Sequence, residues 1–591
     1  MRIKKLLNSL FILLSPFLII IYFLFCINLI LKDFNYAHKS HNLNPAPINW
    51  AAYHFDYFKN YLSNLFLNDT KNLMGLKRID IFIPEKTSKS LLENTPTSTK
   101  KYLKSKLLVN NKIQDVRLRY LGDNSLNWYF EQKSMRIKTK KKEIINRKRY
   151  FEYKISQQMP LKEYVEFKLA KKLEMLVTDV RLVEVYVNEK SKGIYIEKSR
   201  LNESFLRRNK IMPVNMYKGE QFRNDENKIG LEINLFRNKG LWDKLSIFNL
   251  NEYEDKSDLN FLLNNIRKAD NSSNYLNKIL DNGNRNLLSK KSTLEILTQN
   301  PIASSDHNQR LVIDNWSGKF YTIPHDTLYN PNLLSGKDLI LETVSTDSDL
   351  DRAIGQSSYF LNEKYKTLFN YLVKKKIVKE VIDDLKQIKK KYLISEKRDI
   401  GIIQRAYFAG NAMYSSNEEN YDNVIKSLKK REQELIKLFY KKPKASWENN
   451  NEGFNIKVNQ RLPLSNLIVD FQNVKPKWVA IDSNNNLILD KNDTYFYPNE
   501  NDIFLIDVTL FSNRIPTLDL SKSYKSYAMN IANTKFKFFV SNNAKPSKVY
   551  ANNKFSKKKF RIEENFSQSL SPSTNNLPII KKINNKIKIY E

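Results

Sequence analysis

The chain has 591 residues, of which 41% are hydrophobic, 12% aromatic and 27% charged. This composition excludes a globally disordered protein, and the length allows about three or four domains. The single cysteine, Cys26, excludes an intrachain disulfide framework and a CxxC zinc site, and the presence of only 5 histidines argues against a large histidine-based metal centre.

Lysine and arginine outnumber aspartate and glutamate by 99 to 63, which gives a formal net charge of +36. A surplus of this size is typical of nucleic-acid-binding proteins. The lysines are nevertheless spread along the whole chain together with asparagine and isoleucine, and no predicted helix carries a concentrated basic stripe. We therefore interpret the charge as a solvated surface that favours anionic envelope polymers or lipid headgroups, and we expect no nucleic-acid partner.

The N-terminal segment predicts a membrane anchor. No charged residue lies between Lys5 and Lys32, and residues 10–31 are long enough to span the hydrocarbon core, which needs about 20 apolar residues. The alternative, a cleaved signal peptide, would have a shorter apolar region and a small-residue cleavage site. Basic residues precede the span, so the positive-inside rule predicts a single-pass protein of the bacterial inner (cytoplasmic) membrane. Residues 1–32 would be the cytoplasmic tip and anchor, and the bulk of the chain would be extracytoplasmic.

After a juxtamembrane linker at residues 33–75, apolar residues that alternate with polar ones predict strands. The expected strands lie at 76–83, 116–120 and 134–138. Apolar residues at helical spacing predict a helix at 161–176. Residues 181–196 predict a hairpin with a loose connection of about five or six residues that ends at Gly193.

A second hairpin is predicted at residues 309–324, with Gly318 in its turn. From residue 335 to residue 442 the chain is expected to be mostly helical, with one long amphipathic run at 365–393. Short alternating strands between 445 and 540 predict an all-β module that resembles a sandwich. Residues 541–591 form a basic C-terminal region.

Aromatic residues of the β-rich module have two interpretations. Trp478, Tyr495, Phe496 and Tyr497 are suited to a face that stacks on carbohydrate. A sandwich core requires residues of the same kind, so the pattern alone leaves both interpretations open.

The segment from Ser304 to Thr327 carries the clearest sign of chemistry. Asp306 and Asn308 precede the second hairpin and Asp326 follows it, so the hairpin brings both carboxylates and the amide to one place. That arrangement suits phosphoryl transfer, in which one aspartate orients or deprotonates the acceptor hydroxyl while hard oxygen ligands hold Mg²⁺ or Mn²⁺. The alternative is that these residues only form turns and caps.

Several segments, in order along the chain, resemble the CotH family of spore-coat-type atypical protein kinases over roughly residues 76–442. The matching residues are Lys133, Arg136, Ile137 and Lys138; Glu184, Tyr186, Asn188, Gly193, Tyr195 and Glu197; Tyr217, Lys218 and Gly219; Asp306, His307 and Asn308; Ile323 to Asp326; and a helix with Arg431. The resemblance implies a bilobal, atypical kinase-like domain. The expected fold class is therefore α+β, with an N-terminal transmembrane helix, this domain and a C-terminal all-β sandwich-like module.

The resemblance also implies roles for the residues around the second hairpin. Asp306 would be the catalytic aspartate, Asn308 would act in the same loop and bind the metal, and Asp326 would be the main metal ligand. The cofactors would be ATP together with Mg²⁺ or Mn²⁺.

A second set of residues would contact the nucleotide. A basic residue on the strand at 134–138 would hold the α- and β-phosphates, and Arg136 and Lys138 are both candidates. The carboxylate that fixes this cation would be Glu166 or Glu197. Lys218 is either a nucleotide contact or a surface lysine.

Three departures from the family pattern keep two functions open. Glu189 replaces the glycine that usually follows Asn188, His325 replaces the aromatic residue before the metal-binding aspartate, and Leu328 replaces a second acidic residue. The first function is a membrane-anchored kinase that transfers the γ-phosphoryl group of ATP to a hydroxyl of a surface protein or glycan. The alternative is a catalytically inactive, CotH-like scaffold for cell-envelope or surface assembly.

Overall fold

The computed structural model divides into two compact units. The first comprises Met1–Asp351 and Asn370–Glu434, and the second Arg352–Phe369 and Leu435–Glu591. The structure describes residues 14–24, 74–93, 101–109, 111–121, 127, 132–140, 143–145, 148–156, 159–219, 234–246, 254–269, 273–300, 308–325, 329, 331, 348–355, 357–399, 417–458, 464–472, 474–483, 486–508, 534–555, 557–564, 581–583 and 586–588.

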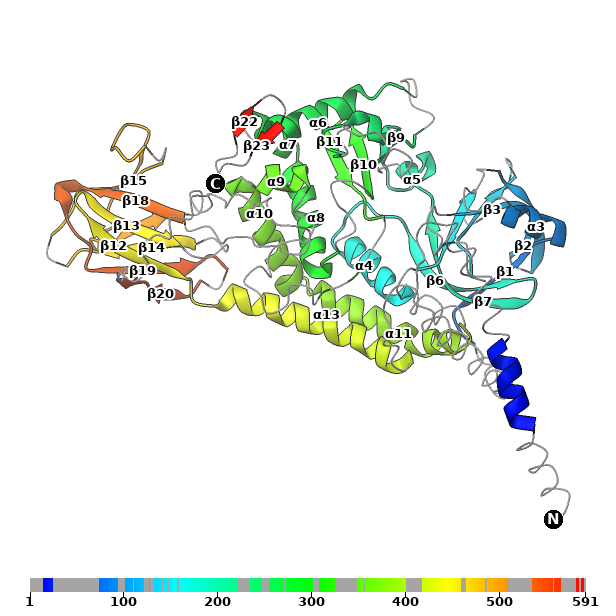
Figure 1. The fold of residues 1–591 in the computed structure, drawn as a ribbon. Helices are drawn as coiled ribbons and strands as arrows, with labels where there is room; N and C mark the ends of the chain where they lie inside the picture. The colour runs from blue at the N-terminus through cyan, green and yellow to red at the C-terminus, as the bar shows by residue number, and fades with distance from the viewer. Residues whose placement is uncertain are drawn as a thin grey trace, which may run out of the picture. The chain divides into compact units, whose positions relative to one another are not determined.

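A closed seven-stranded barrel forms the first part of the first unit, with strand order β1-β2-β3-β4-β5-β7-β6 (Figure 1). The strands are β1 (Lys77–Phe82), β2 (Leu103–Val109), β3 (Lys112–Tyr120), β4 (Met135–Thr139), β5 (Tyr150–Lys154), β6 (Val180–Val187) and β7 (Lys190–Ser199). Neighbouring strands are antiparallel, except that β1 and β6 pair in parallel and close the barrel. Alternate residues such as Ile81, Leu118 and Ile137 fill its interior. The strands predicted in this region are confirmed.

Helix α4 (Pro160–Lys172) lies beside the barrel and packs against β6, β7 and two further helices, α8 (Asn284–Thr298) and α11 (Ile377–Lys397). Its first residue is a proline, which is favoured there because no N–H is needed in the first turn. The helix is shorter than the predicted 161–176, because Glu174 adopts the left-handed conformation with a φ of 56°.

The connection between β6 and β7 is a two-residue turn at Asn188 and Glu189, so the loose connection expected from the sequence is wrong. Both residues are left-handed, with φ values of 49° and 67°, as a tight hairpin turn requires. The Asn188 side chain stabilises the turn, because its amide donates to the Ile83 carbonyl at 2.9 Å and accepts from the Ile83 N–H at 2.8 Å.

The second part of the first unit contains a four-stranded sheet of order β11-β10-β8-β9. Its strands are β8 (Asn215–Gly219), β9 (Trp242–Lys244), β10 (Gln309–Asp314) and β11 (Lys319–Thr322). The predicted hairpin at 309–324 is confirmed, with Gly318 at a φ of 67° in the turn. Helix α8 packs against β11, so the hairpin is supported from one side.

The other helices include one break that the sequence analysis did not anticipate. The single run expected at 365–393 is interrupted by Lys376, which is left-handed with a φ of 53°. The elements are α3 (Glu85–Glu93), α5 (Glu203–Arg208), η4 (Lys239–Leu241), α6 (Ser257–Ala269), α7 (Ser273–Leu280), α9 (Asp349–Gly355), α10 (Ser358–Phe369), the π-helical η5 (Asn370–Lys374) and α13 (Asn417–Tyr440).

The second unit is a β-sandwich whose two sheets have the orders β16-β15-β18-β13-β12-β21 and β17-β14-β19-β20. Its elements are β12 (Ala445–Asn450), β13 (Gly453–Val458), β14 (Leu464–Asp470), β15 (Val479–Ile481), β16 (Thr494–Phe496), β17 (Phe504–Asp507), β18 (Thr534–Val540), η6 (Ser541–Asn543), β19 (Lys548–Asn553), β20 (Lys559–Arg561) and β21 (Glu563–Glu564). The sandwich thus extends past residue 540. Strands β22 (Lys581–Ile583) and β23 (Lys586–Lys588) pair separately.

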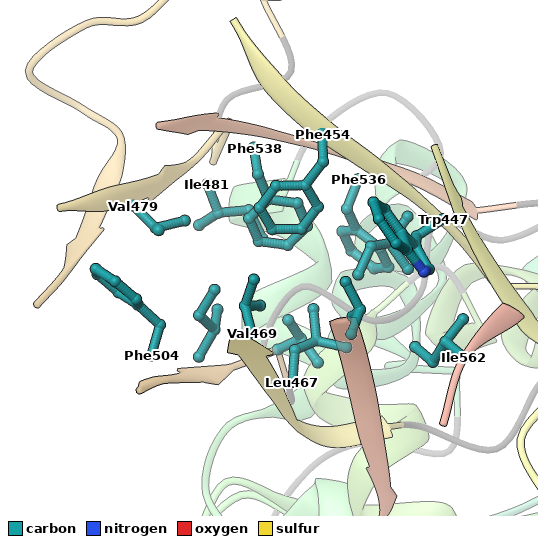
Figure 2. Close-up of a cluster of buried hydrophobic side chains, with 14 of the residues drawn as sticks. Trp447, Phe454, Leu467, Val469, Val479, Ile481, Phe504, Phe536, Phe538 and Ile562 are labelled. Atoms are coloured by element: carbon teal, nitrogen blue, oxygen red, sulfur yellow. The ribbon is translucent and has the colours of Figure 1, made fainter. Parts of the chain in front are cut away.

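The sandwich core consists of apolar side chains that point toward one another from the two sheets (Figure 2). Phe454 on β13 and Phe538 on β18 stack with their ring centroids 4.6 Å apart and their planes 6° apart. Leu467 and Val469 on β14 face them from the second sheet and are fully buried. The alternation of apolar residues along these strands therefore serves to bury one face of each sheet.

The expected transmembrane helix, and with it the single-pass membrane localisation, is corrected by the structure. In the part of the chain that the structure describes, no helix has both the length and the apolar character needed to cross a membrane. Residues 14–24 are helical. The remainder of the apolar segment at 10–31 lies outside the described residues.

Candidate functional site

The first unit contains a buried ion pair between Lys198 on β7 and Glu163 on α4. The Lys198 Nζ lies 3.1 Å from the Glu163 Oε1, and the two side chains are only 3% and 4% exposed. The same ammonium donates to the His325 carbonyl at 2.8 Å and lies 4.6 Å from the centroid of the Phe167 ring. A buried charge requires such partners, so Lys198 ties together the barrel, α4 and the segment after β11.

The end of the second hairpin lies at this ion pair. The Ile323 N–H donates to the Arg310 carbonyl at 3.0 Å, which continues the β10–β11 pairing toward His325. Asn308, directly before β10, is left-handed with a φ of 61°, a conformation that asparagine tolerates better than most residues. Asp306 and Asp326, the predicted catalytic and metal residues, lie outside the described residues.

Glu166, one turn after Glu163 on α4, contacts the segment that leads to Asp306. Its Oε1 accepts from the Asn300 side-chain amide at 2.8 Å, and its Oε2 has no hydrogen-bond partner among the described residues. Burial raises the pKa of Glu166 to about 8, and the negative charge of Glu163 adds to this effect. Helix α4 therefore contacts the segment before Asp306 directly, and it reaches the segment before Asp326 only through Lys198.

Arg431 on α13 contacts the C-terminal end of α8, the helix that precedes the Asp306 segment. Its Nε and Nη2 both donate to the Ile296 carbonyl, at 3.0 and 2.7 Å. The last carbonyls of a helix lack intrahelical partners, so this interaction satisfies one of them. Burial lowers the pKa of Arg431 to about 10. Residue Arg431 thus has a positioning role that the resemblance did not specify.

A row of charged side chains crosses the outer face of the barrel. Register places Arg119, Arg136, Glu152 and Lys198 side by side on β3, β4, β5 and β7. The Arg136 Nε donates to the Glu152 Oε1 at 2.8 Å. Burial alone would raise the pKa of Glu152, but the positive charges of Arg136 and Lys198 outweigh it and lower that pKa. Glu152 and Glu163 offset the charges of Arg136 and Lys198, so Arg119 leaves this face with a small positive surplus.

The other predicted nucleotide contacts have different surroundings. The Lys138 Nζ lies 5.6 Å and 5.5 Å from the ring centroids of Tyr102 and Tyr150, which is cation–π distance. Lys218 sits on β8 in register with Arg310 of β10.

The predicted carboxylate Glu197 does not fix a cation of the 134–138 strand. It accepts from Arg181 Nη2 at 2.6 Å, and it precedes Lys198 by one position on β7, so their side chains point to opposite faces. The carboxylate that pairs with Arg136 of that strand is Glu152. The buried pair beside the second hairpin joins Lys198 to Glu163, and neither residue was a candidate from sequence. Glu163 lies three positions before the candidate Glu166, and Lys198 directly follows the candidate Glu197. Deciding which face of the helix and of the strand is buried would have identified both residues.

Other residues of the CotH-like pattern attach the C-terminal end of α11 to the barrel. The Glu184 Oε2 accepts from the Ser395 hydroxyl at 2.8 Å, and the Asp399 Oδ2 accepts from the Ile194 N–H at 2.7 Å. Gly193 has a φ of 88°, and a Cβ added there would lie 2.0 Å from the Asp399 Oδ1. These matches therefore have a structural role, and Gly193 is required because no side chain fits beside Asp399.

A metal centre is not assembled from the described side chains: they contain no group of three or more His, Cys, Asp or Glu residues that could hold an ion. The metal-binding role of Asp326 and Asn308 therefore stays a prediction. Carboxylate and amide oxygens are nonetheless the donors that Mg²⁺ and Mn²⁺ prefer.

Comparison with known proteins identified no family for this chain. A scan against protein-family models found no match, and a search of curated proteins found none. Among solved structures, the chain is similar to one in the complex of the toxin–antitoxin system HipA and HipB of Shewanella oneidensis MR-1 with its operator DNA. The two share 12% identity over 61% of this chain and 71% of that chain, with a TM-score of 0.19. A likeness at this TM-score carries no argument about fold or function.

Proposed function

We propose that the first unit is a CotH-like kinase domain that binds ATP and transfers its γ-phosphoryl group to a hydroxyl of a protein or glycan. The observation that carries this proposal is the buried Lys198–Glu163 pair, whose lysine also holds the carbonyl of the residue before Asp326. In kinase-type sites a strand lysine that contacts phosphates is fixed by a helix glutamate. Lys198 on a strand and Glu163 on a helix are the residue types and elements that this role needs.

The positive surplus of the barrel face suits the same ligand. Lys198 and Arg136 lie on either side of Glu152 in the register, and they are held in place by Glu163 and Glu152. Preorganised cations of this kind bind phosphate with little reorganisation. We propose Lys198 as the principal phosphate contact in place of Arg136 or Lys138, with Arg136 in a secondary position; the Lys198–Glu163 pair supports this choice.

The reaction requires the residues at the ends of the second hairpin. Asp306 would accept the proton of the acceptor hydroxyl as its oxygen attacks the γ-phosphorus, and the bond to the leaving ADP oxygen breaks. Asp326 and Asn308 would hold Mg²⁺ or Mn²⁺, which neutralises charge on the phosphates when bound. Glu166 and Arg431, through Asn300 and Ile296, would keep the Asp306 segment in place.

A second candidate function is a non-catalytic scaffold with the same fold. Leu328 stands where the family pattern has a second acidic residue, and loss of one carboxylate weakens the binding of a hard divalent ion. In this case the positive face of the barrel would bind a phosphate-bearing polymer without chemistry.

The test measures the thermal midpoint of the full chain with ATP and Mg²⁺ or Mn²⁺, together with the release of ADP. A ligand at 100 times its Kd stabilises by about 2.7 kcal/mol, which is a shift of several degrees. We expect Asp326→Ala and the double variant Glu163→Met with Lys198→Met to lose this shift. Lys171→Ala, on a 67% exposed side chain of the same helix, is the matched control and should keep it.

Two outcomes would overturn the kinase proposal. The absence of a metal-dependent shift in the wild type, with either metal at millimolar ATP, would favour the scaffold. A shift that survives both Asp326→Ala and the double variant would place the nucleotide at another site.

A further inference from the structure

The outer face of the sandwich carries aromatic side chains at one edge of a sheet. Strands β15 and β16 pair with Val479 opposite Phe496 and Ala480 opposite Tyr495. Val479 and Phe496 pack on the core, so the alternation of side chains places Tyr495 on the other face. The core interpretation therefore holds for Phe496, whereas Tyr495 lies on the opposite face of the sheet.

Trp478 and Tyr497 continue the outward row at the adjacent positions of the two chain segments. The rings of Trp478 and Tyr495 meet edge to face, with centroids 5.2 Å apart and planes 68° apart. Tyr497 is 69% exposed. An exposed tyrosine beside a fixed pair of aromatic rings presents a stacking surface to solvent.

Backbone hydrogen bonds hold this surface in position. The Trp478 N–H donates to the Ser541 hydroxyl at 3.2 Å, and the Trp478 carbonyl accepts from the Ser541 N–H at 3.1 Å. After Tyr497, the Asn499 Oδ1 accepts from the N–H groups of Asn501 and Ile503, each at 3.0 Å. The aromatic positions are thus preorganised, which lowers the entropy lost when a ligand binds.

A cavity of about 300 Å³ lies beside the chain segments that lead into β15 and out of β16, and β14 and β17 of the second sheet also line it; its volume is at the lower end of the range for small-ligand sites. Two of its lining residues, Pro476 and Pro498, are close neighbours in sequence of Trp478 and Tyr497. Its polar lining groups are Asp470, Gln472, Lys475, Asn501 and Asp502. Lys475 forms an ion pair with Asp502, so the single lysine is neutralised and the cavity keeps a carboxylate and two amides.

We infer that this edge of the sandwich is a binding site for a neutral glycan. Carboxylates and side-chain amides pair with sugar hydroxyls, and aromatic faces pack against the C–H surface of a pyranose ring. The lining charges disfavour an anionic glycan, since Asp470 and Asp502 outnumber Lys475, although the chain as a whole is strongly basic. The inference does not depend on the proposed kinase function.

The test applies the full chain to a printed array of neutral and anionic oligosaccharides at low and high salt. Binding to at least one neutral glycan is expected to persist at high salt, because stacking and neutral hydrogen bonds are not screened. We expect Tyr497→Ala to weaken this binding by about tenfold, the scale of a central aromatic contact. Gln472→Ala tests the cavity and should weaken binding as well.

Two control variants separate stacking from folding. Tyr497→Phe keeps the ring and should bind as the wild type does. Trp316→Ala removes a 71% exposed aromatic side chain from the other unit and should also leave binding unchanged. Retention of anionic glycans alone, with loss at high salt, would overturn the inference in favour of charge-driven binding. No retained glycan, or equal binding by wild type and Tyr497→Ala, would overturn it too.

Discussion

The two units bury ionisable side chains to different extents. The described core of the sandwich is a cluster of apolar residues from two sheets, and the ionisable side chains buried among its described strands and loops are Asp482 and Asp493. The first unit also has apolar clusters, but it buries more ionisable side chains, which include Glu152, Glu163, Glu184, Glu197, Lys198, Lys291 and Arg431. Apolar residues stabilise a core without a desolvation penalty, and a buried charge must recover that penalty from its partners. The sandwich shows that this chain builds a stable core from apolar residues, so the buried charges of the first unit indicate requirements other than stability.

The largest expected change in the free energy of unfolding is at the Lys198–Glu163 pair, and it tests this comparison of the two units. Lys198→Met leaves the Glu163 carboxylate buried without its cation, and we expect a loss of about 3–5 kcal/mol in the free energy of unfolding. Adding Glu163→Met removes the unpaired charge, so the double variant should lie within about 1 kcal/mol of the wild type. Urea unfolding of the full-length variants measures both values.

The matched variant in the sandwich is Phe454→Ala, which removes one ring of the stacked pair with Phe538. It should also lower stability by about 3–5 kcal/mol, because it leaves a cavity. No second deletion restores that loss, in contrast to the charged pair. If the double variant at Lys198 and Glu163 were as unstable as the single one, the pair would be a packing element like Phe454, and the contrast between the units would fail.

A smaller effect concerns the pH dependence that Glu166 gives to the first unit. Its pKa is raised to about 8 by burial, against an ordinary value near 4.5. Between these two values the unfolded chain has released the proton that the folded chain still holds, so stability falls as the pH rises through this window and levels off above it. The glutamine of Glu166→Gln does not titrate. Its free energy of unfolding should therefore exceed that of the wild type by about 1–3 kcal/mol at alkaline pH, with a smaller difference near pH 5.

The measurement is the difference in urea midpoint between Glu166→Gln and the wild type across this pH range. Glu396, whose pKa burial also raises to about 8, is present in both proteins and cancels in the difference. Glu85→Gln, on an 83% exposed side chain, is the control and should show no pH-dependent difference. A constant difference for Glu166→Gln would mean that the carboxylate is ionised in the folded state.

The sequence predicted the local parts of this fold better than the distant pairings. The hairpin at 309–324 was predictable, because Gly318 marks its turn and alternation marks its strands. The hairpin of β6 and β7 was assigned too long a connection, because its left-handed turn is made by Asn188 and Glu189 without glycine. The break at Lys376 lies inside an uninterrupted amphipathic pattern, so no composition signal marks it.

The candidate site shows the same division. The β10–β11 hairpin followed from local geometry. Glu166 was predicted to fix a cation of the 134–138 strand, but its described partner is the Asn300 amide. The partner of Lys198 depends on which face of β7 meets which face of α4, and their packing is a tertiary contact. Two glutamates one turn apart on one helix are equivalent in sequence, so only the packing distinguishes Glu163 from Glu166.

The smallest expected effect is at Glu189, whose left-handed φ of 67° strains a residue with a side chain by about 1–2 kcal/mol. Glu189→Gly removes that strain but adds conformational entropy to the unfolded chain, which offsets about 0.5–1 kcal/mol of the gain. The net stabilisation should be about 0.5–1 kcal/mol, a rise of one or two degrees in the thermal midpoint. Lys190→Gly, the exposed next residue and the first of β7, has no such strain to relieve and should be destabilising. If both glycine variants were destabilising, the turn at Asn188 and Glu189 would not be the two-residue left-handed turn that sets the β6–β7 register and, through it, the face on which Lys198 lies.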